Sequence, residues 1–265
     1  MNYQAIEIER VEKVARIYLN RPDASNAQNP AMLDELDDAF ATLRSDESVR
    51  VVILAGRGKH FSAGHDLRAA AGRQGHFGVE ARWENEEKRY LNYCLNIFDF
   101  PKPTICQVQG ACIAAGLMVA NMCDLIVASE DAYFSDPVVH SMSAASVEVL
   151  IHPWVMGLRK AKELLFTGER LPAAEALAIG MVNRVVPAEQ LEEATMALAQ
   201  KIAQASPFGM RLTKRSLNRT FDVQGLRTAL SAHFDTHQVS HQSDEFLEHR
   251  QKRYADPANP VKKLS

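Results

Sequence analysis

The sequence contains few cysteines and no pair of them in a CxxC pattern. All of them lie in apolar surroundings: Cys94, Cys106, Cys112 and Cys123. Apolar surroundings without close pairing are typical of buried, reduced thiols in a cytosolic protein. The sequence also lacks a phosphate-binding loop, because Gly56-Arg57-Gly58 has neither a GK[ST] ending nor the GxGxxG pattern.

Long apolar runs and an excess of one charge are also absent. Residues 1–7 are polar and lack the apolar core of a signal peptide. The longest nearly apolar run, Gly110 to Ala120, is too short to span a bilayer. The net charge is 30 − 33 = −3, so no basic field attracts nucleic acid or an anionic membrane. We therefore expect a cytoplasmic protein without nucleic-acid or membrane partners.

What is present is an ordinary globular composition, with 46% hydrophobic and 24% charged residues in a chain of 265. Strand-like and helical patterns alternate over residues 1–190, which predicts an α/β core. Within it we expect a β-hairpin at 3–20, a glycine-containing loop at 69–78 and one helix at 80–98. Residues 191–265 show only helical patterns, at 191–205, 207–218, 223–238 and 243–254.

Two turns rich in small residues each follow a short β-branched strand. The first is Phe61 to Leu67, after the strand at 51–54, and the second is Gln109 to Gly116, after the strand at 104–108. Alanine and glycine let a backbone approach a ligand closely and direct its N–H groups at it. If the two turns meet in space, their N–H groups can stabilise a carbonyl oxygen that gains negative charge.

The chain resembles the crotonase (enoyl-CoA hydratase/isomerase) superfamily over nearly its whole length. The matching segments occur in the family's order: Leu19-Asn20-Arg21-Pro22, Asn26, Val52-Ile53-Leu54-Ala55-Gly56, Phe61-Ser62-Ala63-Gly64-His65-Asp66-Leu67, Pro101-Lys102-Pro103-Thr104, Gln109-Gly110 through Gly116, Cys123-Asp124-Leu125-Ile126-Val127-Ala128, Leu165-Phe166-Thr167-Gly168-Glu169, Glu175-Ala176, Gly180-Met181-Val182 and Arg184-Val185-Val186-Pro187. The ordered set is far more specific than any one of these motifs.

The resemblance implies a crotonase-like ββα spiral core in residues 1–190 and a C-terminal helical trimerisation region in residues 191–265. It also implies an acyl-CoA substrate, with coenzyme A as part of the substrate and no separate cofactor, and a homotrimer or a dimer of trimers. By position, the oxyanion-hole donors are the backbone N–H groups of His65 and Ala115. The family usually has glycine at the second position, so Ala115 makes the hole more crowded.

The resemblance also shows what is missing. Hydratases of this superfamily use two glutamates, and the matching positions here are Met118 and Val138. Neither side chain can accept a proton, whereas a general acid or base contributes about 100- to 10,000-fold to a rate. A standard two-glutamate hydration is therefore not expected.

Three side chains could replace the missing acids. Glu148 lies in an almost wholly apolar segment, so it is either exposed on the outer face of a helix or buried with a raised pKa and suited to acid–base work. Asp136 either lines the same cavity or is a turn residue before Pro137. His140 is either a base or a histidine of a surface loop.

Further substrate-binding positions follow from the motifs, and two of them, Arg21 and Lys59, match regions near the nucleotide end of the ligand. Asp66 either contacts substrate or caps the helix after the turn. The full set of substrate-binding candidates is Arg21, Lys59, Ala63, Gly64, Asp66, Leu67, Gly116, Met118, Val138 and His140.

His233, His237 and His241 recur every four residues and share one face of a predicted helix. Histidines at this spacing can bind zinc. Because no cysteine or carboxylate in the sequence clearly completes a ligand set, we expect these histidines to pack in the trimer or to face solvent. We expect no metal.

Three functions remain open at this stage. The first is an enoyl-CoA hydratase/isomerase-type enzyme that stabilises a thioester enolate through His65 and Ala115, with Glu148 or Asp136 transferring protons. The second is an enoyl-CoA isomerase or a hydrolase of thioester or carbon–carbon bonds. The third is a protein that binds acyl-CoA without catalysis.

Overall fold

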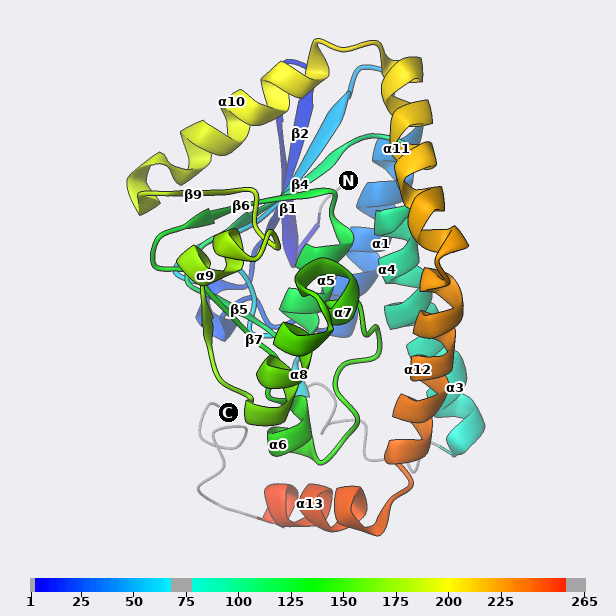
Figure 1. Cartoon of the computed structure of the whole chain (residues 1–265). Helices are drawn as coiled ribbons and strands as arrows, with labels where there is room; N and C mark the ends of the chain where they lie inside the picture. Colours follow the sequence, from blue (N-terminus) through cyan, green and yellow to red (C-terminus); the bar gives the residue numbers. More distant parts are fainter. Residues whose placement is uncertain (1–2, 68–77, 256–265) are drawn as a thin grey trace.

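The computed structural model describes residues 3–67 and 78–255. The loop expected at 69–78 therefore lies outside the described residues, except for Gly78. Within the described part, a six-stranded sheet and a three-stranded sheet are surrounded by helices (Figure 1). Among these residues, no helix combines the length and the apolarity that crossing a membrane requires.

The larger sheet is mostly parallel. From one edge to the other its strands are β1 (Ile6–Val11), β2 (Val14–Leu19), β3 (Val51–Gly56), β4 (Thr104–Val108), β6 (Leu125–Ser129) and β9 (Arg184–Val186). Strands β1 and β2 form the predicted antiparallel hairpin, and every other neighbouring pair is parallel. The α/β class expected from the alternation of strands and helices is confirmed.

Helices cover both faces of this sheet, as a parallel sheet requires. On one face, Val14, Tyr18 and Ile53 pack with residues of α10 (Leu191–Ala203), which crosses the sheet in Figure 1. Alternate residues, such as Ile17 and Leu54, point into the main core. That core also contains side chains of α1 (Pro30–Ser45), α4 (Tyr93–Phe98) and α5 (Ala115–Met122).

The smaller sheet carries the second small-residue turn. It consists of β5 (Ala111–Ile113), β7 (Tyr133–Ser135) and β8 (Leu171–Pro172). We predicted only a turn at 109–116, so β5 is an addition, formed because its three residues pair in register with β7. The four cysteines are free and buried, as expected.

The helix expected at 80–98 is one continuous helical run with a change of geometry in its middle. It comprises α3 (Val79–Glu86), a π-helical segment η2 (Glu87–Asn92) and α4. π-helical turns are rare and are frequent at functional sites, because the extra residue per turn re-aims nearby side chains. Tyr90 lies within this segment.

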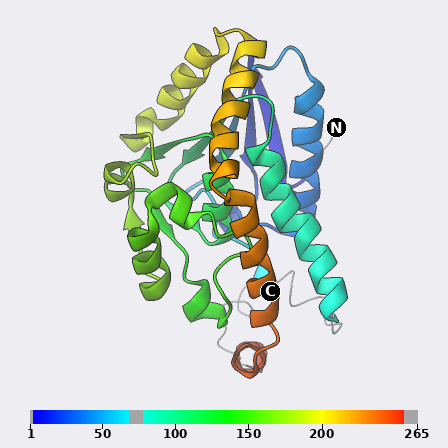
Figure 2. The ribbon, with the colours of Figure 1, turned by 45° about the vertical axis from the view of Figure 1, so that its right-hand side comes forward.

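The C-terminal part is helical, as predicted. Helices α11 (Pro207–Val223) and α12 (Leu226–Ser240) follow each other along one side of the molecule (Figure 2), and α13 (Asp244–Ala255) lies across its end (Figure 1). The division of the chain near residue 190 into two parts stays a prediction. The remaining short elements are η1 (Pro22–Ala24), α6 (Val138–Met142), α7 (His152–Met156), α8 (Leu158–Thr167), α9 (Ala173–Ala178) and η3 (Ala188–Gln190).

Candidate active site

The two small-residue turns meet in space. The Ser62 N–H donates to the carbonyl of Ala111 (3.1 Å), and the Ile113 N–H donates to the carbonyl of Ser62 (3.0 Å). Gly64 has φ +93°, and a Cβ placed on it would lie 3.3 Å from the Ala115 nitrogen. The backbones therefore approach so closely that glycine is needed at position 64.

Each turn contributes a backbone N–H without a backbone acceptor in the described part of the chain: those of His65 and Ala115. Around His65, the bonds to Gln28 use the Gly64 carbonyl and the Asp66 N–H. Ala115 is the first residue of α5, so its N–H has no acceptor within the helix. The preceding residue, Ala114, has φ +47° and ψ −115°, a strained conformation of a kind that clusters at functional sites.

Beside the turns lies a cavity of about 310 Å³. The exposed surface of its wall is mostly apolar and is interrupted by polar side chains, as is typical of a small-molecule site. Its apolar lining includes Ala63, Leu67, Ile113, Ala114, Pro137, Val138, Met142, Ala144, Val147 and Phe246. Its polar lining includes His65, Arg82, Asn85, Glu86, Tyr90, Ser141, Ser146, Glu148, His237, His241, His249 and Arg250.

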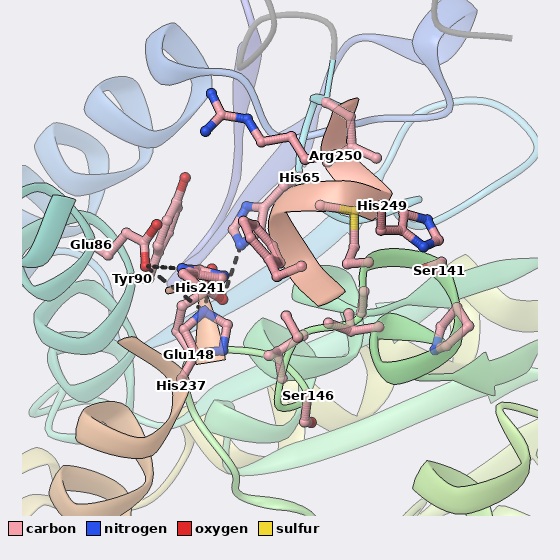
Figure 3. A pocket seen from close by; sticks show the side chains of 18 of the residues that line it. His65, Glu86, Tyr90, Ser141, Ser146, Glu148, His237, His241, His249 and Arg250 are labelled. Carbon is pink, nitrogen blue, oxygen red and sulfur yellow. Dashed lines mark hydrogen bonds and ion pairs between the residues drawn. The ribbon is translucent and has the colours of Figure 1, made fainter. Parts of the chain in front are cut away.

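A histidine–glutamate pair stands at the centre of the polar wall (Figure 3). The His65 Nε2–H donates to Glu148 Oε2 at 3.1 Å, although the two residues are 83 positions apart. The Glu148 side chain is only 7% exposed. The ring of Tyr90, from the π-helical segment, lies 4.1 Å from the His65 ring, centroid to centroid. This packing fixes the imidazole against the carboxylate.

The surroundings of Glu148 favour its ionised form. Burial by itself raises the pKa of this carboxyl, but the charge of His65, its hydrogen bond and the charge of His237 outweigh burial and lower the pKa to about 2. Conversely, burial disfavours the His65 imidazolium, yet Glu148 raises the pKa of His65 overall. We expected an exposed helical Glu148 or a buried one with a raised pKa. The residue is buried in a loop between α6 and α7, and the raised pKa was wrong because two histidines face the carboxylate.

A second polar group on this wall was missed by the sequence analysis. Glu86, the last residue of α3, lies with its Oε2 3.7 Å from His237 Nε2 and 3.9 Å from His241 Nδ1. Burial and the charge of Glu148 raise the pKa of Glu86. Burial, followed by the charge of His237, lowers the pKa of His241 to about 3. Only the four-residue histidine repeat marked this cluster in the sequence, and nothing there pointed to Glu86.

The expectation for the histidine repeat is therefore corrected. His237 and His241 neither face solvent nor lie on an outer surface of the chain: they are buried and line the cavity. His233 is half-buried, and its Nε2–H donates to the carbonyl of Val147 at 2.8 Å. The histidines are buried because their side of α12 packs against the end of α3 and against the loop that contains Val147 and Glu148.

Asp136 does not line the cavity, contrary to the first expectation for it. It is fully buried, and it accepts hydrogen bonds from the Val138 N–H (3.1 Å) and from the Ser146 hydroxyl (2.7 Å). His152 Nε2 lies 3.4 Å from the same carboxyl. These contacts join the β7–α6 turn to the segment before Glu148. They agree with the second expectation for Asp136, a turn residue before Pro137.

We predict that Asp136→Ala lowers the free energy of unfolding by about 3 kcal/mol, because it leaves buried donors of Val138 and Ser146 without an acceptor. Urea unfolding followed by circular dichroism measures this change. The control is Asp235→Ala at an exposed position on α12, expected to shift stability by less than about 0.5 kcal/mol. Lost turnover at unchanged stability would contradict the structural role.

His140 also lies outside the cavity lining. It is exposed in α6, not in a loop, and its Nε2–H donates to the carbonyl of Phe166 at 2.8 Å. A role as catalytic base is therefore not supported by its position, because the ring faces the end of α8 and not the Glu148 wall.

The other candidates divide into three groups. Ala63, Leu67 and Val138 line the cavity, and their contact with substrate stays a prediction. Gly64 and Gly116 lie in the paired turns, where a Cβ on Gly116 would come within 2.8 Å of the Ser62 carbonyl oxygen.

The third group lies outside the lining. Met118 is fully buried in the main core and does not line the cavity, because α5 is buried on all sides. Arg21 and Asp66 form an ion pair of 2.8 Å, and Asp66 directly precedes the helical residue Leu67, so its roles as helix cap or substrate contact stay predictions. Lys59 is exposed, and its role near a nucleotide stays a prediction.

Comparisons with known proteins agree on one family. A family model described as enoyl-CoA hydratase/isomerase matches residues 9–257. EchA13 of Mycobacterium tuberculosis, which carries an enoyl-CoA hydratase name, is 41% identical over 258 residues, covering 90% of this chain and 81% of EchA13.

Solved structures give the same result. One from Mycobacterium smegmatis, described as an enoyl-CoA hydratase, has 49% identity and a TM-score of 0.85 and covers 89% of this chain and 94% of its own. An enoyl-CoA hydratase/isomerase from Xanthobacter autotrophicus Py2 has 33% identity and a TM-score of 0.91, covering 99% and 96%. The crotonase-like fold expected from the motifs is thereby confirmed.

Proposed function

The chain belongs to the enoyl-CoA hydratase/isomerase family, and from this premise we propose that it adds water reversibly to the double bond of an enoyl-CoA. In this proposal the thioester carbonyl oxygen binds between the N–H groups of His65 and Ala115. The contact between the two turns and the lack of backbone acceptors for these amides within the described residues support the assignment. The hydratase names of its relatives support the reaction.

The observation that carries the proposal is the buried His65–Glu148 pair beside the paired turns. The Glu148 carboxylate takes a proton from water as the water oxygen bonds to the β-carbon. The electrons of the double bond move to the thioester oxygen, where the two N–H groups stabilise the enolate. The protonated Glu148 then returns the proton to the α-carbon, so one carboxylate performs both transfers.

Double-bond isomerisation is the second candidate. It requires one base that carries a proton between two carbons and no activated water. The absence of carboxylates at Met118 and Val138 favours it, because a single ionised glutamate is enough. Hydrolysis of a thioester or a carbon–carbon bond is a third candidate and acyl-CoA binding without turnover a fourth, and one experiment distinguishes all four.

The test is a turnover assay of the purified protein with short- and medium-chain trans-2-enoyl-CoAs. Loss of the conjugated enoyl absorbance is followed, and the products are identified by mass. A product heavier by one water supports hydration. An isomer of unchanged mass supports isomerisation, a free acid or shortened chain supports hydrolysis, and tight binding without any product supports a non-catalytic acyl-CoA-binding protein.

We also propose that the chain forms a homotrimer or a dimer of trimers in the cytoplasm. Several large apolar side chains of α11 are exposed in the single chain, including Leu217 (65%) and Val223 (89%). Patches of this kind are usual at protein–protein interfaces. The free, buried cysteines agree with a reducing compartment.

Leu217→Asp is expected to shift the protein from three or six chains toward monomer, because it places a charge in the apolar interface. Size-exclusion chromatography with light scattering measures the mass. The matched control is Phe166→Asp near the C-terminal end of α8, which is also exposed (71%) and belongs to the end of α8 that contacts His140 of α6. A wild-type monomer would refute the assembly.

A further inference from the structure

Four acceptor atoms converge on one point of the cavity wall (Figure 3). Glu86 Oε2 lies 3.7 Å from His237 Nε2 and 3.9 Å from His241 Nδ1. Glu148 Oε1 lies 3.8 Å from the same His237 nitrogen. The ligand atoms of Glu86, His237 and His241 all lie within 4.8 Å of one another.

The two imidazole nitrogens in this group lack hydrogen-bond partners among the described residues. Neither His237 Nε2 nor His241 Nδ1 has a hydrogen bond among the described residues, although both residues are more than nine-tenths buried. His237 Nδ1 lies 3.5 Å from the carbonyl of Ala145, which can only accept, so the neutral ring carries its proton on Nδ1. In that form, the one that binds a metal, the lone pair of Nε2 faces the carboxylates. Buried acceptors that face one another without a donor are unfavourable unless a cation lies between them.

We propose that Glu86, His237 and His241 form a binding site for a divalent transition-metal ion of the zinc class. Two histidines and one glutamate are a common ligand set for zinc, with a fourth position left for water or substrate. All three side chains line the cavity, so that fourth position opens toward it. This site was not expected from the sequence, because Glu86 reaches the histidines only through the packing of α3 against α12.

Neighbouring residues already hold the three ligand side chains in position. His237 lies in the last turn of α12 and His241 is the helical C-cap residue four positions later, which places both rings on one side of the helix. The Gln238 side-chain amide donates to Glu86 Oε2 at 2.6 Å, and the Ala145 carbonyl orients His237. Hydrogen bonds of this kind hold metal ligands in position. Ligand atoms around tetrahedral zinc lie about 3.3 Å apart. The separations of Glu86 Oε2 from the two imidazole nitrogens, 3.7 and 3.9 Å, therefore need to shorten by about half an ångström.

The local charge balance is compatible with a cation. Arg82 lines the same cavity and opposes a positive ion, whereas the carboxylates of Glu86 and Glu148 attract one. The ion would replace the missing hydrogen-bond donors of the two imidazoles.

The test uses the full-length protein without substrate, so its result is separate from that of the hydratase proposal. The protein is stripped with EDTA, dialysed and titrated with zinc chloride by calorimetry, and its metal content is measured by mass spectrometry. We expect about one zinc per chain with a micromolar or tighter Kd. Cobalt(II) should give the intense visible bands of a four-coordinate site.

Glu86→Gln and His241→Asn should each weaken zinc binding by about 100-fold or more. The control is His233→Gln on the same helix, whose nitrogen is engaged by Val147, and it should bind zinc as the wild type does. Circular dichroism checks that each variant folds. Absence of zinc binding to the wild type at millimolar zinc would overturn the proposal. Undiminished binding by both ligand variants would also overturn it, because the ion would then lie elsewhere.

Discussion

Glu148→Gln is expected to lower kcat with an enoyl-CoA substrate by about 100- to 10,000-fold, the contribution of one general base. Glutamine keeps the size of the side chain and can still accept the hydrogen bond from His65, but it cannot take a proton from water. The Kd for a saturated acyl-CoA should change much less, because the carbonyl is held by backbone N–H groups. Steady-state kinetics and calorimetry measure the two quantities.

Two comparisons make this result specific. Glu148→Asp keeps a carboxylate on a shorter side chain and should recover part of the activity. Glu169→Gln removes a carboxylate at an exposed position and should leave kcat unchanged. If Glu148→Gln retained wild-type turnover, Glu148 could not be the base, and the proton transfer would have to be assigned to another group of the cavity.

Gly64→Ala is expected to lower kcat/KM by about 100-fold, close to the effect of losing one oxyanion-hole donor. The added methyl group would lie 3.0 Å from the Ile113 carbonyl oxygen and 3.3 Å from the Ala115 nitrogen. It therefore forces the two turns apart and crowds the Ala115 N–H at the point where the thioester oxygen would bind. Kinetics with the same enoyl-CoA measure the loss.

The matched control is Gly180→Ala. Gly180 also has a left-handed backbone (φ +81°), but no atom lies within 4 Å of the added carbon. Both substitutions carry the backbone strain of alanine at positive φ, of about 1–2 kcal/mol, so thermal melting should show destabilisation of both variants, larger for Gly64→Ala because of its added contacts. Only Gly64→Ala should lose activity. Equal activity of the two variants would contradict an oxyanion hole at His65 and Ala115.

Local sequence patterns were sufficient for much of the fold. The strands predicted at 51–54 and 104–108 are present and fully buried, the first extending to Gly56, and the hairpin expected at 3–20 is formed by β1 and β2. Strand character and helical periodicity depend on neighbours within a few residues, so they can be read from the chain directly. The π-helical segment at 87–92 could not be predicted, because ordinary helical periodicity does not mark it.

The candidate site, like the fold, could be predicted from the sequence only in part. The sequence by itself determined where the two small-residue turns lie, and that positions 118 and 138 carry no carboxylate. It also marked Glu148 as a polar residue in apolar surroundings. It could not determine the ionisation of Glu148, because His65 and His237 come from distant segments and reverse the effect of burial on its pKa.

Only the tertiary structure decided which polar side chains share the cavity. Asp136 and His140, close in sequence to Val138, turn away from the cavity, whereas Glu86 meets Gln238 across 152 positions of the chain. The direction of a side chain depends on how its helix or loop packs against segments far along the sequence. Periodicity shows which face of a helix is buried, but only the packing of whole elements determines which residues that face meets.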